Sequence, residues 1–459
     1  MTETVAEMLD AYRAGAVTPE DIVARSFARI RAHNDPAIFI TLREEADVRA
    51  EASALSCTGD SGLPLYGIPV AVKDNIDVKG LPTTAACPAF LYRPSIDATA
   101  VARLRAAGAL ILGKTNLDQF ATGLVGVRTP YGIARNLFDK KLIAGGSSTG
   151  SALAVGAGFA PIALGTDTAG SGRVPAAFAN IVGLKPSRGM VSAAGVVPAC
   201  RTLDCISVFA LTVDDAVTTL KAIAGPDAAD PFSRHYPLGA VGPMGDWVRL
   251  GVPVVGQRLF FGDKESAKAY DDALARFSGL AARIVEIDIE PFYAAARLLY
   301  EGPWVAERYL AAKVLIASAP EAMHPVTREV ILGGERGTAA DVFAAFYRLE
   351  ALRRISDYTF RAVDALVLPT APTIYTVEDV LANPIALNSR LGTYTNFVNL
   401  LDLCGLAVPA GMRGDGTPFG VTLLAPAGRD AALAAIGRQF HYATSLPLGA
   451  LKARQPVLA

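Results

Sequence analysis

The chain has 459 residues, with 43 lysines and arginines against 44 aspartates and glutamates, and 51% hydrophobic residues. A near-zero net charge with both signs interspersed argues against a nucleic-acid partner, which needs a concentrated basic surface, and the apolar content argues against disorder. A chain of this length buries enough surface to fold without a metal or disulfide staple.

The N-terminal residues 1–60 are predicted to form a helical segment. Thr18 and Pro19, followed by acids at 20–21, are typical of a helix start, because threonine can cap the first N–H groups and proline fits the first helical position. Residues 1–4 show no basic region leading into an apolar run, so we expect no signal peptide.

Residues 65–215 have the pattern of an α/β core. Short apolar runs alternate there with glycine-rich turns and amphipathic segments. We predict strands at 68–72 and 109–112, with a helix at 98–107 between them. Residues 142–166 carry no charge, but they contain too many glycines and hydroxyls for a lipid-facing helix. We therefore predict a buried helix and strand there, and no membrane contact.

Beyond this core the chain changes character twice. A Pro/Gly-rich connection is predicted at 225–250, followed by a strand at 250–255, a helix from Lys264 and an edge strand at 283–289. A helical block at 290–360 precedes strands at 365–368 and 419–424 and a last helix near 430–441. Because strands return after the helical block, we predict one mixed sheet in a single domain spanning 1–459.

The cysteines and histidines indicate neither a metal site nor a histidine base. The five cysteines lack metal-ligand spacing and are expected to be reduced thiols of a cytoplasmic protein; they are Cys57, Cys87, Cys200, Cys205 and Cys404. The four histidines lie outside the densest Gly/Ser region and are expected on the surface or in loops; they are His33, His235, His324 and His441.

The Gly/Ser-rich loop at 144–151 allows three interpretations. A phosphate loop would need a lysine that is absent here. A nucleophile elbow at Gly146, Ser148 and Gly150 would need an aspartate and a histidine later in the chain. A purely structural turn would need no reactive partner at all.

Two flanking features favour chemistry at this loop. The apolar strand at 68–72 ends in Lys73, an odd choice because burying an unpaired ammonium is costly. The small-residue turn at 165–173 can aim successive backbone N–H groups at one spot, which is what an oxyanion needs.

Lys73, Ser147 and Ser171 would then form a relay that needs no histidine. The Lys73 amine can act as the base if burial lowers its pKa towards neutrality. The open alternative is that Lys73 pairs with a carboxylate, such as that of Asp74 or Asp77.

These motifs resemble the amidase signature family. The matching motifs are, in order, 67–75, 145–152, 165–177 and 183–186. The resemblance is dense from about 65 to 215 and extends over nearly the whole chain. It implies an α/β fold with a large mixed β-sheet core covered by helices on both faces, amide hydrolysis through an acyl-enzyme, and no cofactor or metal.

The resemblance also implies roles for single residues. Lys73 would be the general base, Ser171 the nucleophile, and Ser147 the proton relay after a cis peptide at Gly146–Ser147. The backbone N–H groups of four successive residues would line the oxyanion hole: Thr168, Ala169, Gly170 and Ser171. Asp167 and Arg173 would fix this loop as a buried pair.

Within the family, the stretch 197–211 and the Ala-Gly-Ser-Gly sequence at 169–172 resemble the allophanate hydrolases. Tyr300 and Arg308 would then hold the substrate's carboxylate, because a guanidinium can bind a carboxylate bidentately. The loop containing Gly123 would add a backbone contact. The alternative is that Tyr300 and Arg308 are ordinary residues on one helix, just over two turns apart.

The resemblance further implies a small anionic amide as substrate and a homodimer, which exposed apolar positions in the N-terminal helices would permit. Longer members carry a C-terminal decarboxylating domain, which is expected here to be absent, either deleted or on a separate partner. Three other functions stay open: hydrolysis of another small amide, malonamate-like or aryl; the A-type subunit of glutamyl-tRNA amidotransferase; and a catalytically silent scaffold.

Overall fold

The structure, a computed structural model, describes residues 3–56 and 62–453, and Cys57 lies outside them. Its centre is an 11-stranded sheet with the strand order β1-β3-β2-β4-β6-β5-β10-β11-β9-β7-β8. Parallel and antiparallel pairs occur in it, so the predicted single mixed sheet is confirmed. The strands are β1 (Phe39–Leu42), β2 (Pro69–Lys73), β3 (Leu110–Thr115), β4 (Ile162–Asp167), β5 (Val182–Lys185), β6 (Cys205–Ala210), β7 (Arg249–Pro253), β8 (Arg283–Ile287), β9 (Ala365–Pro369), β10 (Leu403–Met412) and β11 (Pro418–Pro426).

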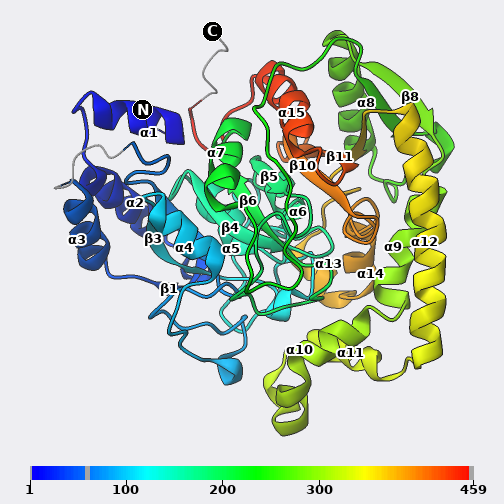
Figure 1. The fold of residues 1–459 in the computed structure, drawn as a ribbon, viewed down its shortest axis with the longest axis horizontal. Coiled ribbons are helices and arrows are strands. Elements are labelled where there is room, and N and C mark those ends of the chain that lie inside the picture. Colours follow the sequence, from blue (N-terminus) through cyan, green and yellow to red (C-terminus); the bar gives the residue numbers. More distant parts are fainter. Residues whose placement is uncertain (1–2, 57–61, 454–459) are drawn as a thin grey trace.

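Helices surround the sheet (Figure 1). In the N-terminal half they are α1 (Val5–Arg13), α2 (Pro19–His33), α3 (Glu45–Ser56), α4 (Thr99–Ala106), α5 (Thr149–Gly156), α6 (Val174–Phe178) and α7 (Val213–Ile223). In the C-terminal half they are α8 (Lys264–Gly279), α9 (Glu290–Glu301), α10 (Val305–Ser318), α11 (Pro325–Leu332), α12 (Ala339–Ala362), α13 (Val377–Ala382), α14 (Ala386–Leu391) and α15 (Asp430–Thr444).

The two faces of the sheet pack into separate cores because side chains alternate along each strand. On β2, Val70 and Val72 join a core built with α4, α7, α8 and α15, whereas Ala71 joins a core with α5 and α6 on the other face. On β9, Val367 belongs to the first core and Leu366 to one with α9 and α12. The expected cover of helices on both faces is confirmed.

Within its described residues, 3–56, the N-terminal segment is mainly helical and contains one strand. Thr18 caps α2 with Pro19 in its first turn, as predicted, and its side chain accepts from the Asp21 N–H. Residues 39–42, however, form β1, which pairs antiparallel with β3. The four-residue run carries no turn signal of its own, and pairing with a distant strand defines it.

The predicted strands at 68–72, 109–112, 250–255, 283–289, 365–368 and 419–424 correspond to β2, β3, β7, β8, β9 and β11. β10 was not predicted, because its Gly405 and Pro409 interrupt the apolar run. Residues 142–166 contain α5 and the start of β4, both buried, as expected. Between α7 and β7 the structure has only turns and irregular chain.

The histidines depart from expectation at one position. His33 and His235 are exposed and His324 is half-buried, but His441 is buried on α15, 2% exposed. Burial lowers the pKa of His441 to about 3. The surface prediction for His441 is therefore wrong, because α15, which packs on β10, β11 and α7, buries this residue. No helix within 3–56 and 62–453 is long and apolar enough to cross a membrane.

Candidate active site

The candidate site lies where β2 and β4 end side by side. The two strands are parallel neighbours, so their carboxyl ends meet at one edge of the sheet, where open α/β folds place their ligands. β2 ends at Lys73 and β4 ends at Asp167. Helix α5 begins at Thr149, and its first turn follows the Gly/Ser-rich loop directly.

Lys73 contacts two hydroxyls at this edge. It is fully buried, and its Nζ donates to Ser147 Oγ at 2.8 Å and to Thr166 Oγ1 at 2.7 Å. The alternative pairing of Lys73 with Asp74 is wrong, because the Asp74 carboxylate forms an ion pair with Lys114 at 3.3 Å. Among the described residues, Lys73 forms no ion pair with any carboxylate.

The surroundings of Lys73 favour its neutral form. Burial lowers the pKa of Lys73 from its ordinary value of 10.5 to about 7. The negative charges of Asp118, Asp204 and Asp167 oppose this shift, and the positive charge of Arg308 adds to it. An amine with such a pKa exists partly uncharged at neutral pH and can accept a proton.

Ser147 is presented by a tightly packed loop. The Gly146–Ser147 peptide bond is cis, as the family resemblance implied. A Cβ on Gly146 would lie 2.1 Å from Asp118 Oδ2, so only glycine fits. Thr149 Oγ1 donates to the Gly145 carbonyl at 2.7 Å, and this bond closes the loop onto the start of α5.

Ser148, the nucleophile of the elbow interpretation, is occupied elsewhere. It is fully buried, and its Oγ donates to the Thr166 carbonyl at 3.1 Å. No histidine forms a hydrogen bond with it among the described residues. The geometry therefore gives no support to a Ser–His elbow at this loop.

Ser171 sits in the turn that follows β4. Its Oγ donates to the Gly123 carbonyl at 3.4 Å, which brings the predicted Gly123 loop to this point. Of the two hydrogen bonds that the relay needs, the one between Lys73 and Ser147 is formed. The other, between Ser147 Oγ and Ser171 Oγ, is not formed within the described chain.

The turn from 168 to 171 leaves its donors available. No hydrogen bond from the N–H groups of these four residues occurs within the described part of the chain. Asp167 and Arg173 hold the turn from below as a fully buried pair, with Arg173 Nε 2.8 Å from Asp167 Oδ2. The Gly172 N–H also donates to Asp167 Oδ2, at 3.0 Å.

Tyr300 and Arg308 belong to different helices, so their interpretation as neighbours on one helix is wrong. Tyr300 lies in the last turn of α9 and Arg308 lies in α10, and the helical path is interrupted between them at 302–304. The interruption turns the two side chains together: Arg308 Nη2 donates to Tyr300 OH at 3.3 Å, and the guanidinium lies 5.2 Å from the ring centroid.

Arg308 is buried, 1% exposed, and is only partly satisfied. Its Nη1 donates to Thr122 Oγ1 at 2.9 Å and to the Ala121 carbonyl at 3.4 Å, next to Gly123. Its Nε has no hydrogen-bond partner, and it forms no ion pair among the residues that the structure describes. A buried guanidinium in this condition is a ready binding point for an anion.

Three residues of the site were missed from the sequence. Thr166 shares Lys73 with Ser147. Asp118 accepts from the N–H groups at 125, 126 and 128 and so shapes the loop that carries Gly123. Asp204 accepts from Thr168 Oγ1 at 2.5 Å. The sequence offered no local signal for these contacts, because most of them join segments that are distant along the chain.

A cavity of about 1090 Å³ opens beside the site. Tyr300 and Arg128 are in its wall, and most of the remaining wall comes from 290–348 and from α14 with the turn after it. Lys73, Ser147 and Ser171 do not line it. The helical block therefore shapes a space next to the Tyr300–Arg308 pair.

Comparison with known proteins gives one family. The profile described as Amidase matches residues 21–434. The chain is 48% identical to the urea amidolyase of Lachancea kluyveri over 422 residues, which cover 91% of this chain and 23% of that protein. The chain thus spans about a quarter of the length of this relative.

For two further similar proteins, the match covers a larger share of the other chain. The structure of Kluyveromyces lactis allophanate hydrolase superposes with a TM-score of 0.93 and 41% identity, covering 99% of this chain and 75% of that one. The A-type subunit of the glutamyl-tRNA(Gln) amidotransferase of Thermus thermophilus is 36% identical, over 94% of this chain and 95% of its own length.

Proposed function

The chain belongs to the amidase family, and from this premise we propose that it hydrolyses the terminal amide of allophanate and releases ammonia. Its likeness to urea amidolyase and to allophanate hydrolase supports this substrate. The observation that carries the proposal is the buried Arg308 guanidinium, which has no ion-pair partner among the described residues and keeps its Nε unpaired.

Allophanate combines an amide with a carboxylate in a very small molecule. A site for it needs a cation at a fixed short distance from the nucleophile. Arg308 and Ser171 are linked through the 121–123 segment, since Arg308 contacts Ala121 and Thr122 while Ser171 contacts Gly123. We place the carboxylate on Arg308 and Tyr300, with a backbone contact at Gly123.

Acylation would begin with proton transfer along the relay. Ser171 Oγ attacks the amide carbon while its proton passes to Ser147, whose own proton passes to the neutral amine of Lys73. The backbone N–H groups of residues 168–171 stabilise the oxyanion that forms. Lys73 then returns the proton through Ser147 to the leaving nitrogen, the C–N bond breaks, and ammonia departs from an acyl-enzyme on Ser171.

Deacylation uses the same groups in reverse. A water molecule gives its proton to the relay and attacks the acyl carbon, and Ser171 leaves as the reprotonated alcohol. The product is a dicarboxylated amine, which loses carbon dioxide. A decarboxylating domain, on the same chain or a separate one, would complete that conversion.

The test measures ammonia release from allophanate beside urea, malonamate and propionamide. Release from allophanate should be fastest and should be abolished by Ser171→Ala. Arg308→Met removes a charge-assisted contact of about 1.5 to 3 kcal/mol, so KM for allophanate should rise about 10- to 100-fold while KM for propionamide changes little. Equal losses on both amides would rule out Arg308 as the carboxylate contact.

A second function is favoured by one observation, the match over 95% of the length of an A-type amidotransferase subunit. In that role the same residues would release ammonia from glutamine within a larger assembly. Glutaminase activity that depends on added subunits, with no turnover of allophanate, would establish this function instead.

We further propose a homodimer and a cytoplasmic location. The four described cysteines carry free, buried thiols, which supports a reducing compartment. Exposed apolar positions were expected on the N-terminal helices, but the described parts of those helices carry no large exposed apolar side chain. Such side chains are found on α10 and α12 instead, including Val314, Phe343 and Tyr347. Light scattering on the purified protein measures the oligomeric state.

A further inference from the structure

The buried carboxylate of Asp204 lies between the turn that carries Ser171 and the helix that carries Arg308. Asp204 is 9% exposed, in the loop that leads into β6. It accepts from Thr168 Oγ1 at 2.5 Å, at the start of the turn that carries Ser171. It also accepts from the N–H groups of Ala199 at 2.8 Å and Cys200 at 3.2 Å.

The segment around Asp204 is tied to the helix that carries Arg308. Glu307, the residue before Arg308 on α10, accepts from the Thr202 N–H at 2.8 Å and from the Thr202 hydroxyl. A movement of α10 would therefore move the segment that holds Thr168. This connection joins the proposed carboxylate contact to the proposed oxyanion turn.

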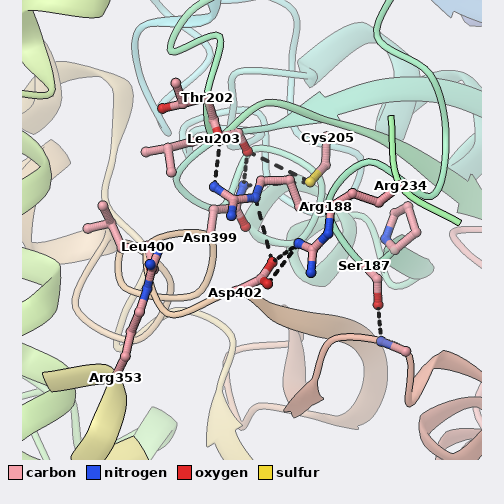
Figure 2. A network of polar contacts seen from close by, with 12 residues as sticks. Ser187, Arg188, Thr202, Leu203, Cys205, Arg234, Arg353, Asn399, Leu400 and Asp402 are labelled. Carbon is pink, nitrogen blue, oxygen red and sulfur yellow. Dashed lines mark hydrogen bonds and ion pairs between the residues drawn. The ribbon is translucent and has the colours of Figure 1, made fainter. Parts of the chain in front are cut away.

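Asn399 secures the same segment from the other side. Its Nδ2 donates to the Leu203 carbonyl at 2.8 Å (Figure 2). It also donates to the Asp167 carbonyl at 2.7 Å, so one side chain joins the Asp204 segment to the end of β4. The outer part of this network consists of partly exposed ion pairs: Asp402 pairs with Arg234 at 2.7 Å and with Arg188 at 3.6 Å.

The charge of Asp204 acts on both cations of the site. It raises the pKa of Lys73, and the positive charge of Arg308 in turn lowers the pKa of Asp204. No ion pair within 4 Å neutralises it among the described residues. On its own segment, Cys200 and Cys205 are the titratable neighbours. Burial raises the pKa of Asp204 to about 6, against the lowering effect of its hydrogen bonds, so the carboxylate is charged above that pH.

We propose that Asp204 is a positioning residue that fixes the Thr168–Ser171 turn relative to α10 and sets the charge to which Lys73 and Arg308 respond. This inference rests on the proposed function for its site, but it does not depend on allophanate being the substrate. Two consequences separate it from a purely structural role. Without the negative charge, the pKa of Lys73 falls further, and Arg308 attracts an anionic substrate more strongly.

The experiment uses Asp204→Asn in the full chain, with Asp402→Asn as the matched control from the outer part of the network. The first measurement is the rate at which a fluorophosphonate labels Ser171 as a function of pH, which needs no natural substrate. The second is the ratio of KM for propionamide to KM for allophanate. Circular dichroism verifies that each variant is folded.

For Asp204→Asn we expect labelling at the high-pH plateau to fall about tenfold, because the turn is less well fixed. The acid limb should move down by about half a pH unit or more, because Lys73 loses a neighbouring negative charge. The KM ratio should rise about threefold, whereas Asp402→Asn should leave all three values unchanged. An unmoved acid limb together with an unmoved ratio would overturn the inference.

A second pair of variants covers the case in which Asp204→Asn does not fold. Thr168→Val removes the hydroxyl donor to Asp204 but keeps the backbone N–H, so labelling should slow and the acid limb should move in the same direction. Thr168→Ser should restore both. Equal behaviour of the valine and serine variants would contradict the proposal. If wild-type protein is labelled but does not turn over allophanate, the proposed substrate is wrong, and the acid limb of the labelling profile alone then decides this inference: an unmoved limb in Asp204→Asn overturns it.

Discussion

Replacing Lys73 by methionine is predicted to end catalysis and, at the same time, to stabilise the fold at neutral pH. Lys73 is fully buried among hydroxyls, and burial lowers its pKa from 10.5 to about 7. Between these two pH values the unfolded chain binds a proton on this lysine that the folded chain largely lacks. The folded state is therefore penalised, and the stability of the wild-type protein rises with pH through this window.

The size of the effect follows from the pKa values. Since one pKa unit corresponds to about 1.4 kcal/mol, the lysine costs the fold about 4 kcal/mol at pH 7 and about 2 kcal/mol at pH 9. Methionine removes this cost but leaves the Ser147 and Thr166 hydroxyls without their donor, at about 1 kcal/mol each. The variant should be about 2 kcal/mol more stable at pH 7 and equal to wild type at pH 9.

Thermal unfolding at the two pH values measures this difference. For 459 residues the unfolding entropy gives about 1 kcal/mol per degree, so Lys73→Met should melt about 2 °C higher than wild type at pH 7 and at the same temperature at pH 9. Lys114→Met is the control, because its removal leaves the buried Asp74 carboxylate unpaired and costs about 3 to 5 kcal/mol. That variant should melt lower at both pH values.

The same pKa predicts the activity profile. Ammonia release should fall about tenfold per pH unit below about pH 7, because the amine of Lys73 must be neutral to accept a proton. The reasoning would be refuted if the difference in melting temperature between wild type and Lys73→Met were the same at pH 7 and pH 9. Lys73 would then be charged in the fold at neutral pH, and its assignment as general base would fail with it.

Two further predictions concern the packing that holds the site. Gly146→Ala would place a Cβ 2.1 Å from Asp118 Oδ2, so it should destabilise the fold by about 1 to 3 kcal/mol and reduce ammonia release. The control is Gly256→Ala, whose Cβ meets nothing within 4 Å and which should leave stability and ammonia release unchanged. Arg173→Met leaves Asp167 buried without its cation and should lower the melting temperature by about 3 to 5 °C. Replacing both residues by apolar ones should restore most of the lost stability. A double variant as unstable as Arg173→Met would contradict the buried-pair interpretation.

Much of the candidate site could be predicted from local patterns. The motifs at 67–75, 145–152 and 165–177 contain Lys73, Ser147 and Ser171, and the start of α2 at Thr18 and Pro19 was predicted from capping alone. Such signals act over a few residues: a cap bonds to the next turn, and an apolar run identifies a buried strand. They are legible without knowledge of the rest of the chain.

The contacts that define the site's chemistry depend on distances that the sequence does not express. Thr166 meets Lys73 across 93 positions, and Asn399 meets Asp167 across 232. The interruption at 302–304 places Tyr300 and Arg308 on different helices, and the prediction of a helical block at 290–360 did not locate it.

Local patterns along the chain thus identify the residues that carry reactive groups and the short segments that form strands and helices around them. They do not tell whether Lys73 is buried without a carboxylate partner, whether Asp74 pairs with Lys114 instead, or whether Arg308 keeps an unsatisfied guanidinium. These properties come from the folded arrangement, because pKa values and ion pairing depend on burial and on the charges within a few ångströms. Both are set by the packing of strands and helices from distant parts of the chain.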